Sequence, residues 1–231
     1  MEELLPMVFS IRLFGYKFDI TSSIFYQWII IAVLTVLAIW ATKDLKKVPD
    51  KKQTVVEMLV QTFNSLVKEN MGKSYKNFVP YIGTLAIFLL TMNLLGLIGF
   101  KPPTLDISVV SAFALITFVI VQANAIQKIG VGHYFLAYFS PFVPMLPLNL
   151  LERIMLPVSL TLRLFGNMTA SVVIVDLIYN KLGNVAFGLG QLVIPIPFHA
   201  YFDAFDGTIQ MIIFMMLTMV NIRIVAEGAV D

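Results

Sequence analysis

The sequence predicts an all-α protein that crosses a membrane several times. Hydrophobic residues make up 58% of the 231 residues and charged residues only 13%, whereas a soluble domain usually carries about 25% charged residues. The mean hydropathy is +0.86. Because a helix needs about 20 apolar residues to span a bilayer, the length leaves room for about five or six spans and for no separate soluble catalytic domain.

Residues 24–41 contain no charge and form the first predicted span. The next stretch, 42–79, holds eight of the sixteen basic residues. Basic loops stay on the cytoplasmic side of a membrane, so we expect this loop in the cytoplasm and the N-terminus outside. Residues 53–70 have apolar side chains at helical spacing and a polar opposite face. This pattern favours a helix on the membrane surface and, equally, a helix docked on a partner protein.

Two more uncharged stretches, 78–100 and 107–127, are separated by the short segment 101–106 and predict an outward and an inward span. Two longer apolar segments follow, 145–179 and 185–226, and prolines interrupt both. Each exceeds the length of a perpendicular span. We therefore expect a hairpin of two strongly tilted helices with an outer turn and with the C-terminus in the cytoplasm.

Arg163 lies within the first of these long segments, between uncharged stretches, and Ser159 and Asn167 share its helix face at one turn's distance. Ionisable residues at membrane depth are costly and are therefore functional candidates. Arginine keeps its proton in proteins. Its charge can attract an anion, repel cations, or pair permanently with a carboxylate such as Asp176 or Asp203.

The second long segment carries matching polar residues at steps of three and four: Asp203, Asp206, Gln210 and, further along, Asn221. In a hairpin, Asp176 and Asp203 lie toward the outside. Glu152 and Asn221 lie toward the cytoplasm. The alternative for Glu152 is that its side chain simply extends to the membrane surface. Since Arg163 lies between, this order predicts an ion path interrupted by a fixed positive charge. A static salt bridge of Arg163 is the alternative.

Four blocks resemble subunit a of F-type ATP synthases: 160–168 (LTLRLFGNM), 147–152 (PLNLLE), 93–98 (NLLGLI) with 103–106 (PTLD), and 209–218 (IQMIIFMMLT). The resemblance implies a stator subunit beside a ring of c subunits, in a complex with the peripheral-stalk b subunits. Two half-channels would load and unload the ring carboxylates with H⁺ or Na⁺. The basic loop, which fits a cytoplasmic face, favours the plasma membrane of a bacterium, with an organelle as the alternative.

Arg163 matches the family's essential arginine, and Asn167 and Gln210 match positions near it. Asp203 stands where relatives often carry histidine or glutamate, Asp106 matches an acidic residue of the outer loop, and Glu152 precedes the arginine helix. Relatives often place a glutamate or histidine nine residues after the arginine, where this chain has Val172. Either Asp176 or Asp203 is then the outer carboxylate.

The chain is not expected to be an enzyme by itself, because it lacks a phosphate-binding glycine loop. We expect no cofactor, no nucleic-acid partner, and no metal site beyond transient Na⁺. A small secondary ion transporter is the alternative function, although such folds usually contain repeated halves. A purely structural membrane anchor would have little need for a buried arginine.

Overall fold

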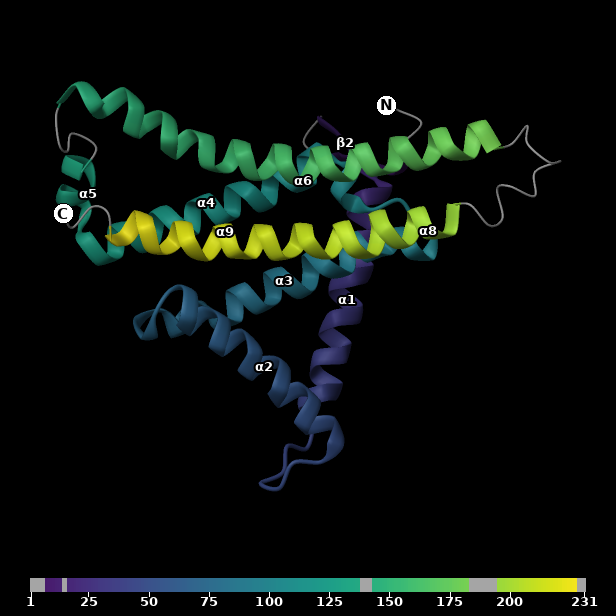
Figure 1. Ribbon diagram of the computed structural model, residues 1–231, viewed down its shortest axis with the longest axis horizontal. Coiled ribbons are helices and arrows are strands. Elements are labelled where there is room, and N and C mark those ends of the chain that lie inside the picture. The colour runs from purple at the N-terminus through teal and green to yellow at the C-terminus, as the bar shows by residue number, and fades with distance from the viewer. Residues whose placement is uncertain (1–6, 14–15, 138–142, 183–194, 228–231) are drawn as a thin grey trace.

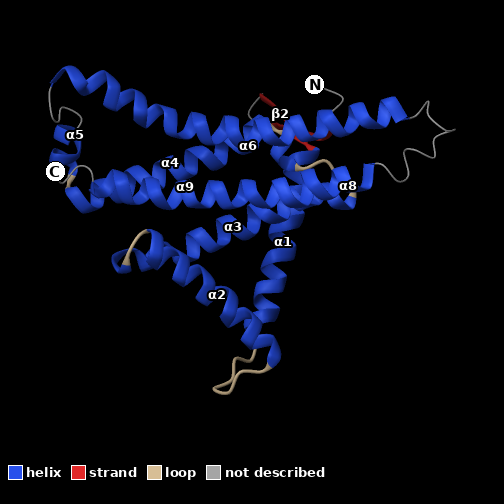
Figure 2. Cartoon of the chain, viewed as in Figure 1, coloured by secondary structure: helices blue, strands red, loops and turns tan. Residues whose placement is uncertain are grey.

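The computed structural model describes residues 7–13, 16–137, 143–182 and 195–227. Within these ranges, five helical stretches are long and apolar enough to cross a membrane: Ser22–Thr42, Lys73–Ile98, Ile107–Ile129, Leu146–Lys181 and Ile196–Glu227. They confirm the prediction of an all-α membrane protein. Figure 2 shows one addition that the sequence analysis did not foresee. Strands β1 (Met7–Leu13) and β2 (Tyr16–Thr21) form an antiparallel hairpin before the first helix.

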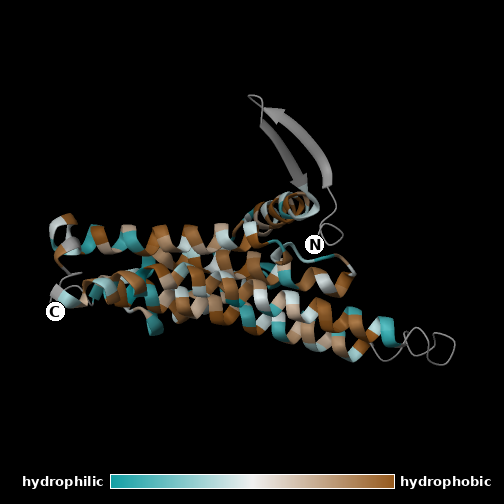
Figure 3. Ribbon diagram, turned by 90° about the horizontal axis from the view of Figure 1, so that it is seen from above, coloured by the Kyte–Doolittle hydropathy of each residue, from teal (hydrophilic) through white to brown (hydrophobic). Residues whose placement is uncertain are grey.

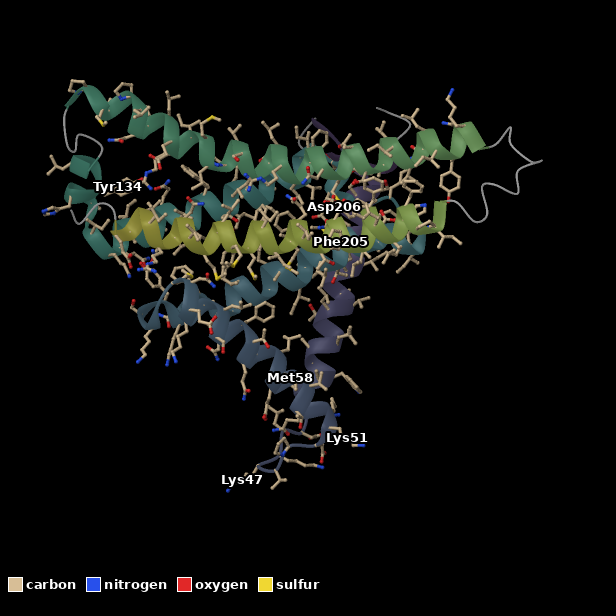
Figure 4. All side chains as sticks on the ribbon, viewed as in Figure 1. Lys47, Lys51, Met58, Tyr134, Phe205 and Asp206 are labelled. Carbon is tan, nitrogen blue, oxygen red and sulfur yellow. The ribbon has the colours of Figure 1, made fainter. Side chains whose placement is uncertain are left out.

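Helices α1 (Ser22–Thr42) and α2 (Lys51–Asn70) form a V that stands apart from the other long helices (Figure 1). Lys47 and Lys51 lie at the tip of this V, far from the main bundle (Figure 4). Most large apolar side chains of α1 are exposed, among them Trp28, Val36 and Trp40. Such exposure suits a helix that lipid or a partner subunit covers along most of its length.

The C-terminal half of α2 packs against its own chain. Val67 is buried, and the ring of Phe63 lies 3.4 Å from the place that a Cβ on Gly83 would take. Met58 and Leu59, further toward the N-terminal end, remain exposed. The apolar face of α2 is therefore divided between the core and the surface. The sequence left two alternatives for this face, the membrane surface and a partner protein. They now concern only the N-terminal half of α2.

Four longer helices make the bundle: α3 (Val79–Asn93), α4 (Ile107–Ile129), α6 (Leu146–Leu182) and α9 (Gly207–Glu227). Helix α4 packs against both α6 and α9, and α3 packs against α9. Apolar side chains such as Leu89, Leu164 and Phe214 fill one core cluster. In Figure 3 hydrophobic residues dominate the middle of the bundle, and hydrophilic ones gather near the helix ends.

Helix α6 runs beside α9 along the longest axis of the molecule (Figure 1). Its 37 residues correspond to about 55 Å of α-helix, much more than the hydrocarbon thickness of about 30 Å. A helix of this length must tilt steeply or extend beyond the hydrocarbon. It passes through Pro157, where the hydroxyl of Thr161 donates a hydrogen bond to the Pro157 carbonyl at 2.8 Å.

The second long apolar segment is not uniformly α-helical. It comprises α8 (Pro195–His199), a π-helical stretch η6 (Ala200–Asp206) and then α9. Residues 185–194 of the predicted helix 185–226 lie outside the described residues. Short helices fill the connections: η1 (Lys73–Phe78), η2 (Leu94–Ile98), η3 (Pro103–Leu105), α5 (Val131–Ala137) and η4 (Val143–Met145).

Candidate functional site

A polar contact joins the middle of α6 to the first turn of α9. The amide nitrogen of Asn167 on α6 donates a hydrogen bond to the amide oxygen of Gln210 on α9 at 2.8 Å. Gln210 is only 1% exposed, whereas Asn167 is exposed. The hydroxyl of Ser171, one turn beyond Asn167, is bonded to the Asn167 carbonyl at 2.8 Å. The structure thus brings together two residues that the sequence placed on separate helices.

Arg163 lies one turn before Asn167 and is partly buried. Within the part of the chain that the structure describes, its guanidinium has no hydrogen bond or ion pair; the ion pairs there join other residues. The static salt bridge that the sequence left open, with Asp176 or Asp203, is therefore not formed among these residues. A partly buried cation that has no partner among the described residues is available to an anion from another chain.

Asp203 is held by a histidine. Its carboxylate oxygen Oδ2 lies 2.7 Å from Nδ1 of His199, one turn earlier, and the other ring nitrogen lies 3.3 Å from the hydroxyl of Tyr179 on α6. In the tautomer with the proton on Nδ1, the imidazole donates to the carboxylate and accepts from the phenol. The three side chains form one hydrogen-bonded chain between η6, α8 and α6.

The Asp203 carboxylate also lies directly against the backbone of Gly96. A Cβ on Gly96 would stand 2.7 Å from the carboxylate carbon of Asp203, which is closer than atoms can approach. Asp203 sits in the π-helical stretch, a rare winding that often accompanies functional sites. Because glycine at position 96 has no side chain, the Asp203 carboxylate can lie against its backbone. Asp203 is only 6% exposed there.

A cavity of about 210 Å³ opens beside this carboxylate. Its walls come from α6, from the segment after α3 and from α8 with η6. They include Asp176, Asp203, His199 and Tyr179 together with Val172 and Lys101. Asp176 is exposed, and it lies thirteen residues after Arg163, about 20 Å along an α-helix. Both carboxylates that the sequence offered for the outer side thus line one cavity.

The cavity lies at the end of the bundle where α1 begins. Phe100, another lining residue, packs its ring against Tyr26 in the first turns of α1 with centroids 5.4 Å apart. The basic loop follows the opposite end of α1. The cavity and the lysine-rich loop are therefore at opposite ends of the first span.

The remaining predicted residues are not gathered at this cavity. Asp106 is the N-cap of α4, where its carboxylate accepts hydrogen bonds from the Ser108 amide at 3.0 Å and the Thr21 hydroxyl at 3.4 Å. Asn221 donates to the Leu217 carbonyl of its own helix at 2.7 Å. The others are exposed or partly exposed: Glu152, Ser159 and Asp206.

Sequence reasoning missed His199 and Tyr179 as site residues. The signal for His199 was its spacing: a histidine four residues before an aspartate lies on the same helix face. Tyr179 carried no comparable signal, because twenty residues separate it from His199 in the sequence. No three His, Asp or Glu side chains within the described ranges group into a metal-binding cluster.

Comparison with known proteins decides the family. The family model "ATP synthase A chain" matches residues 24–223. The chain belongs to this family. Among its relatives, the ATP synthase subunit a of Moorella thermoacetica is 35% identical over 210 residues, covering 90% of this chain and 92% of that protein. The subunit a of Geotalea daltonii is 36% identical over 206 residues, covering 87% and 86%.

A further relative bears on the coupling ion. The protein named "ATP synthase subunit a, sodium ion specific" from Propionigenium modestum is 32% identical over 224 residues, covering 90% of this chain and 75% of that protein. The resemblance found in the sequence motifs is thereby confirmed. As a subunit a, this chain is a membrane-sector component of an ATP synthase complex.

Proposed function

We propose that this subunit a is the stator ion channel of its ATP synthase. It provides two half-channels, one from the outside and one to the cytoplasm, through which H⁺ or Na⁺ reaches and leaves the carboxylates of a c-subunit ring. Ion flow then drives ring rotation and ATP synthesis on other subunits. The subunit itself carries out no chemical reaction. The observation that carries this proposal is the partly buried, unpaired guanidinium of Arg163 between polar residues of α6 and α9.

The outer half-channel is the cavity beside Asp203. Two carboxylates, an imidazole and a phenol line it, and these groups can hydrate a cation or pass a proton along a hydrogen-bonded chain. Its place at the start of α1, away from the lysine-rich loop, supports an opening to the outside, because basic loops stay in the cytoplasm. The same rule places the N-terminus outside and the C-terminus in the cytoplasm.

Arg163 separates the two half-channels. Its fixed charge draws a deprotonated ring carboxylate across the interface and holds that site free of its ion. It also prevents a cation from crossing directly between the half-channels. Such a leak would dissipate the driving force, about 2.3 kcal/mol per elementary charge per 100 mV, without turning the ring. Asn167 and Gln210 orient the region next to it, while Ser159, Glu152 and Asn221 lie on the cytoplasmic path.

The exposed side of α6 is the surface that faces the ring. Gly166 lies on it, and a Cβ there would meet nothing within 4 Å. The chain's own packing therefore does not require glycine at this position, and Ala170, one turn on, is also small and exposed. Small side chains allow helices in membranes to approach closely. The exposed side chains of α1 contact lipid and the b subunits of the peripheral stalk.

Replacement of the arginine tests the proposal. In membrane vesicles that contain the complete ATP synthase, Arg163→Ala is expected to abolish ATP synthesis driven by an imposed ion gradient, because the ring site loses its electrostatic partner. Arg223→Ala is the matched control. Arg223 lies on α9 in an exposed pair with Glu227 at 2.8 Å, a kind of pair that contributes little, so this variant should retain synthesis.

Normal ion-driven synthesis by the Arg163→Ala complex would refute the assignment. The alternative of a small secondary transporter makes a different prediction. A transporter purified alone and placed in lipid vesicles moves its substrate, whereas a stator subunit conducts ions only together with a c ring. Co-purification with the ring and the ATP-hydrolysing sector is the expected result.

A further inference from the structure

A hollow of about 400 Å³ opens between the C-terminal half of α2 and the short helix η1. It takes no part in the proposed ion path. Among the described residues that line it, two carry a positive charge, three carry an amide or a hydroxyl, and none is acidic: Gln61, Asn64, Ser65, Lys68 and Lys76. The two acidic residues of α2, Glu57 and Glu69, are not part of this wall. Such a wall favours an anion with several oxygen atoms.

The backbone brings the two lysines of this hollow together. Helix α2 ends at Asn70, and Gly72 then takes a φ of +97°, a value that glycine adopts far more readily than other residues. After this turn, η1 packs against α2. Tyr75 is only 1% exposed, and the ammonium group of Lys128 on α4 lies 3.6 Å from the centroid of its ring. Packing of its neighbour therefore holds Lys76 beside α2.

Neither lysine has a partner within the part of the chain that the structure describes. The ion pairs there join other residues, and the side chains of Lys68 and Lys76 form no hydrogen bond. The amides and the hydroxyl of the wall are likewise unbonded among these residues, whereas Thr62 of the same helix donates to the Met58 carbonyl at 2.9 Å. Two like charges at one hollow repel each other, and a bound anion removes that repulsion.

The hollow lies at the depth of lipid headgroups. Lys76 is the fourth residue of the stretch Lys73–Ile98, which is long and apolar enough to cross a membrane. Lysine ammonium groups are common ligands of phosphate. Val60, one turn before Asn64 on the same side of α2, is 47% exposed. A polar hollow with an exposed apolar side chain beside it suits a lipid, whose phosphate enters the hollow and whose chain covers Val60.

We propose that this hollow binds a phosphate group at the face of the membrane that carries the lysine-rich loop. The two lysines supply the charge, and the amides and the hydroxyl supply further hydrogen bonds. An anionic phospholipid such as phosphatidylglycerol and inorganic phosphate both carry this group, and the exposed Val60 favours the lipid. The alternative is that the lysines attract anionic lipid only diffusely, as basic segments beside a membrane do in general.

Three variants distinguish a defined site from diffuse attraction. Lys68→Gln combined with Lys76→Gln removes both charges at the hollow. Ser65→Trp fills the hollow and keeps both charges. Lys47→Gln combined with Lys51→Gln is the matched control, because it removes two charges at the tip of the V, at the opposite end of α2 (Figure 4). All five side chains are exposed, so each variant is expected to assemble.

The first measurement uses phosphatidylcholine vesicles that contain the complete ATP synthase and a photoactivatable phosphatidylglycerol. After illumination, mass spectrometry quantifies the label on residues 61–76. We expect the label to fall about fivefold for each lysine removed at the hollow. Ser65→Trp should lower it to a similar extent, whereas the control variant should stay close to the wild type.

A second measurement identifies the source of the phosphate group. Radioactive inorganic phosphate replaces the labelled lipid, and the ATP-hydrolysing sector, which itself handles phosphate, is first removed from the vesicles. Lipid labelling that depends on the hollow identifies the phospholipid as the ligand. Retention of inorganic phosphate that depends on the hollow, without such lipid labelling, identifies the dissolved anion.

Equal binding by the wild type and Ser65→Trp in both measurements would overturn the proposal, and so would an equal fall in the control variant. A carbodiimide cross-link of Lys68 or Lys76 to a carboxylate of another subunit would overturn it as well, since the hollow would then hold a protein. None of these outcomes bears on the proposed ion path, because binding is measured without ATP synthesis.

Discussion

Asp203 and Arg163 differ in the bonding partners that the described part of the chain provides for their side chains. Asp203 is seated against Gly96, bonded to His199 at 2.7 Å and only 6% exposed. Arg163 is partly exposed and has no bonding partner in the described part of the chain. Beside it, a Cβ on Gly166 would meet nothing within 4 Å.

The two sites therefore differ in whether the described residues supply the partner that a desolvated charge needs. A charge removed from water needs a partner, because its desolvation is otherwise uncompensated. For Asp203 the chain supplies that partner through η6, α8 and the segment after α3. For Arg163 the described part of the chain supplies no such partner. Asp203 and the residues that hold it can therefore be tested by substitutions within this chain.

The largest effect within the outer cavity is expected from Asp203. Asp203→Asn removes a buried carboxylate that no neighbouring group replaces, and we expect coupled ATP synthesis to fall roughly a hundredfold, as for loss of a proton-transfer group. Asp176→Asn should reduce it much less, because Asp176 is exposed at the cavity and water can take over its role. The measurement is ATP synthesis in vesicles under an imposed ion gradient. The reverse order would identify Asp176 as the outer carboxylate.

A smaller effect is expected from the glycine that seats the carboxylate. In Gly96→Ala, the new Cβ forces the Asp203 carboxylate away from its place and from His199, so we expect a several-fold loss of ATP synthesis. Gly132→Ala on α5 is the control, since a Cβ there would meet nothing within 4 Å. Equal activity of both variants would show that the tight contact with Gly96 does not position Asp203.

The smallest effect is expected from Asp106. It tests whether this carboxylate only caps α4 or belongs to the ion path. Asp106→Ala removes the cap of α4 and should destabilise the subunit by about 1 kcal/mol, seen as a lower midpoint of thermal unfolding of the purified complex. Asp50→Ala is the control, because Asp50 precedes α2 without a side-chain capping bond. Asp106→Asn retains a capping oxygen and should preserve coupled synthesis. A strong loss in Asp106→Asn would instead show that Asp106 belongs to the ion path.

The length of the uncharged hydrophobic stretches and the low content of charged residues were enough to predict the all-α membrane class. The uncharged stretches around residues 24–41 and 107–127 leave few alternatives, because backbone groups within lipid must be hydrogen-bonded internally, and a continuous apolar stretch of this length achieves that as a helix. Arg163 was found in the same way, as a charge where lipid makes charge costly. The family motif around it then led to the role that we propose for it.

Tertiary structure decided which polar residues meet. Asp176 lies on α6, whereas His199 and Asp203 lie on α8 and η6. No local spacing shows that these three residues line one cavity. The contact of Asn93 with Gly207 spans 114 residues. The hairpin of β1 and β2 escaped prediction because short strands carry a weak pattern beside long apolar helices.

The sequence by itself therefore determined the membrane helices, the single central arginine and the family, since burial in lipid acts on each segment independently. Only the packed structure determined that, among the described residues, Asp203 has a bonding partner and Arg163 has none. That distinction depends on distances between side chains of different helices, which the order of residues along one helix does not contain.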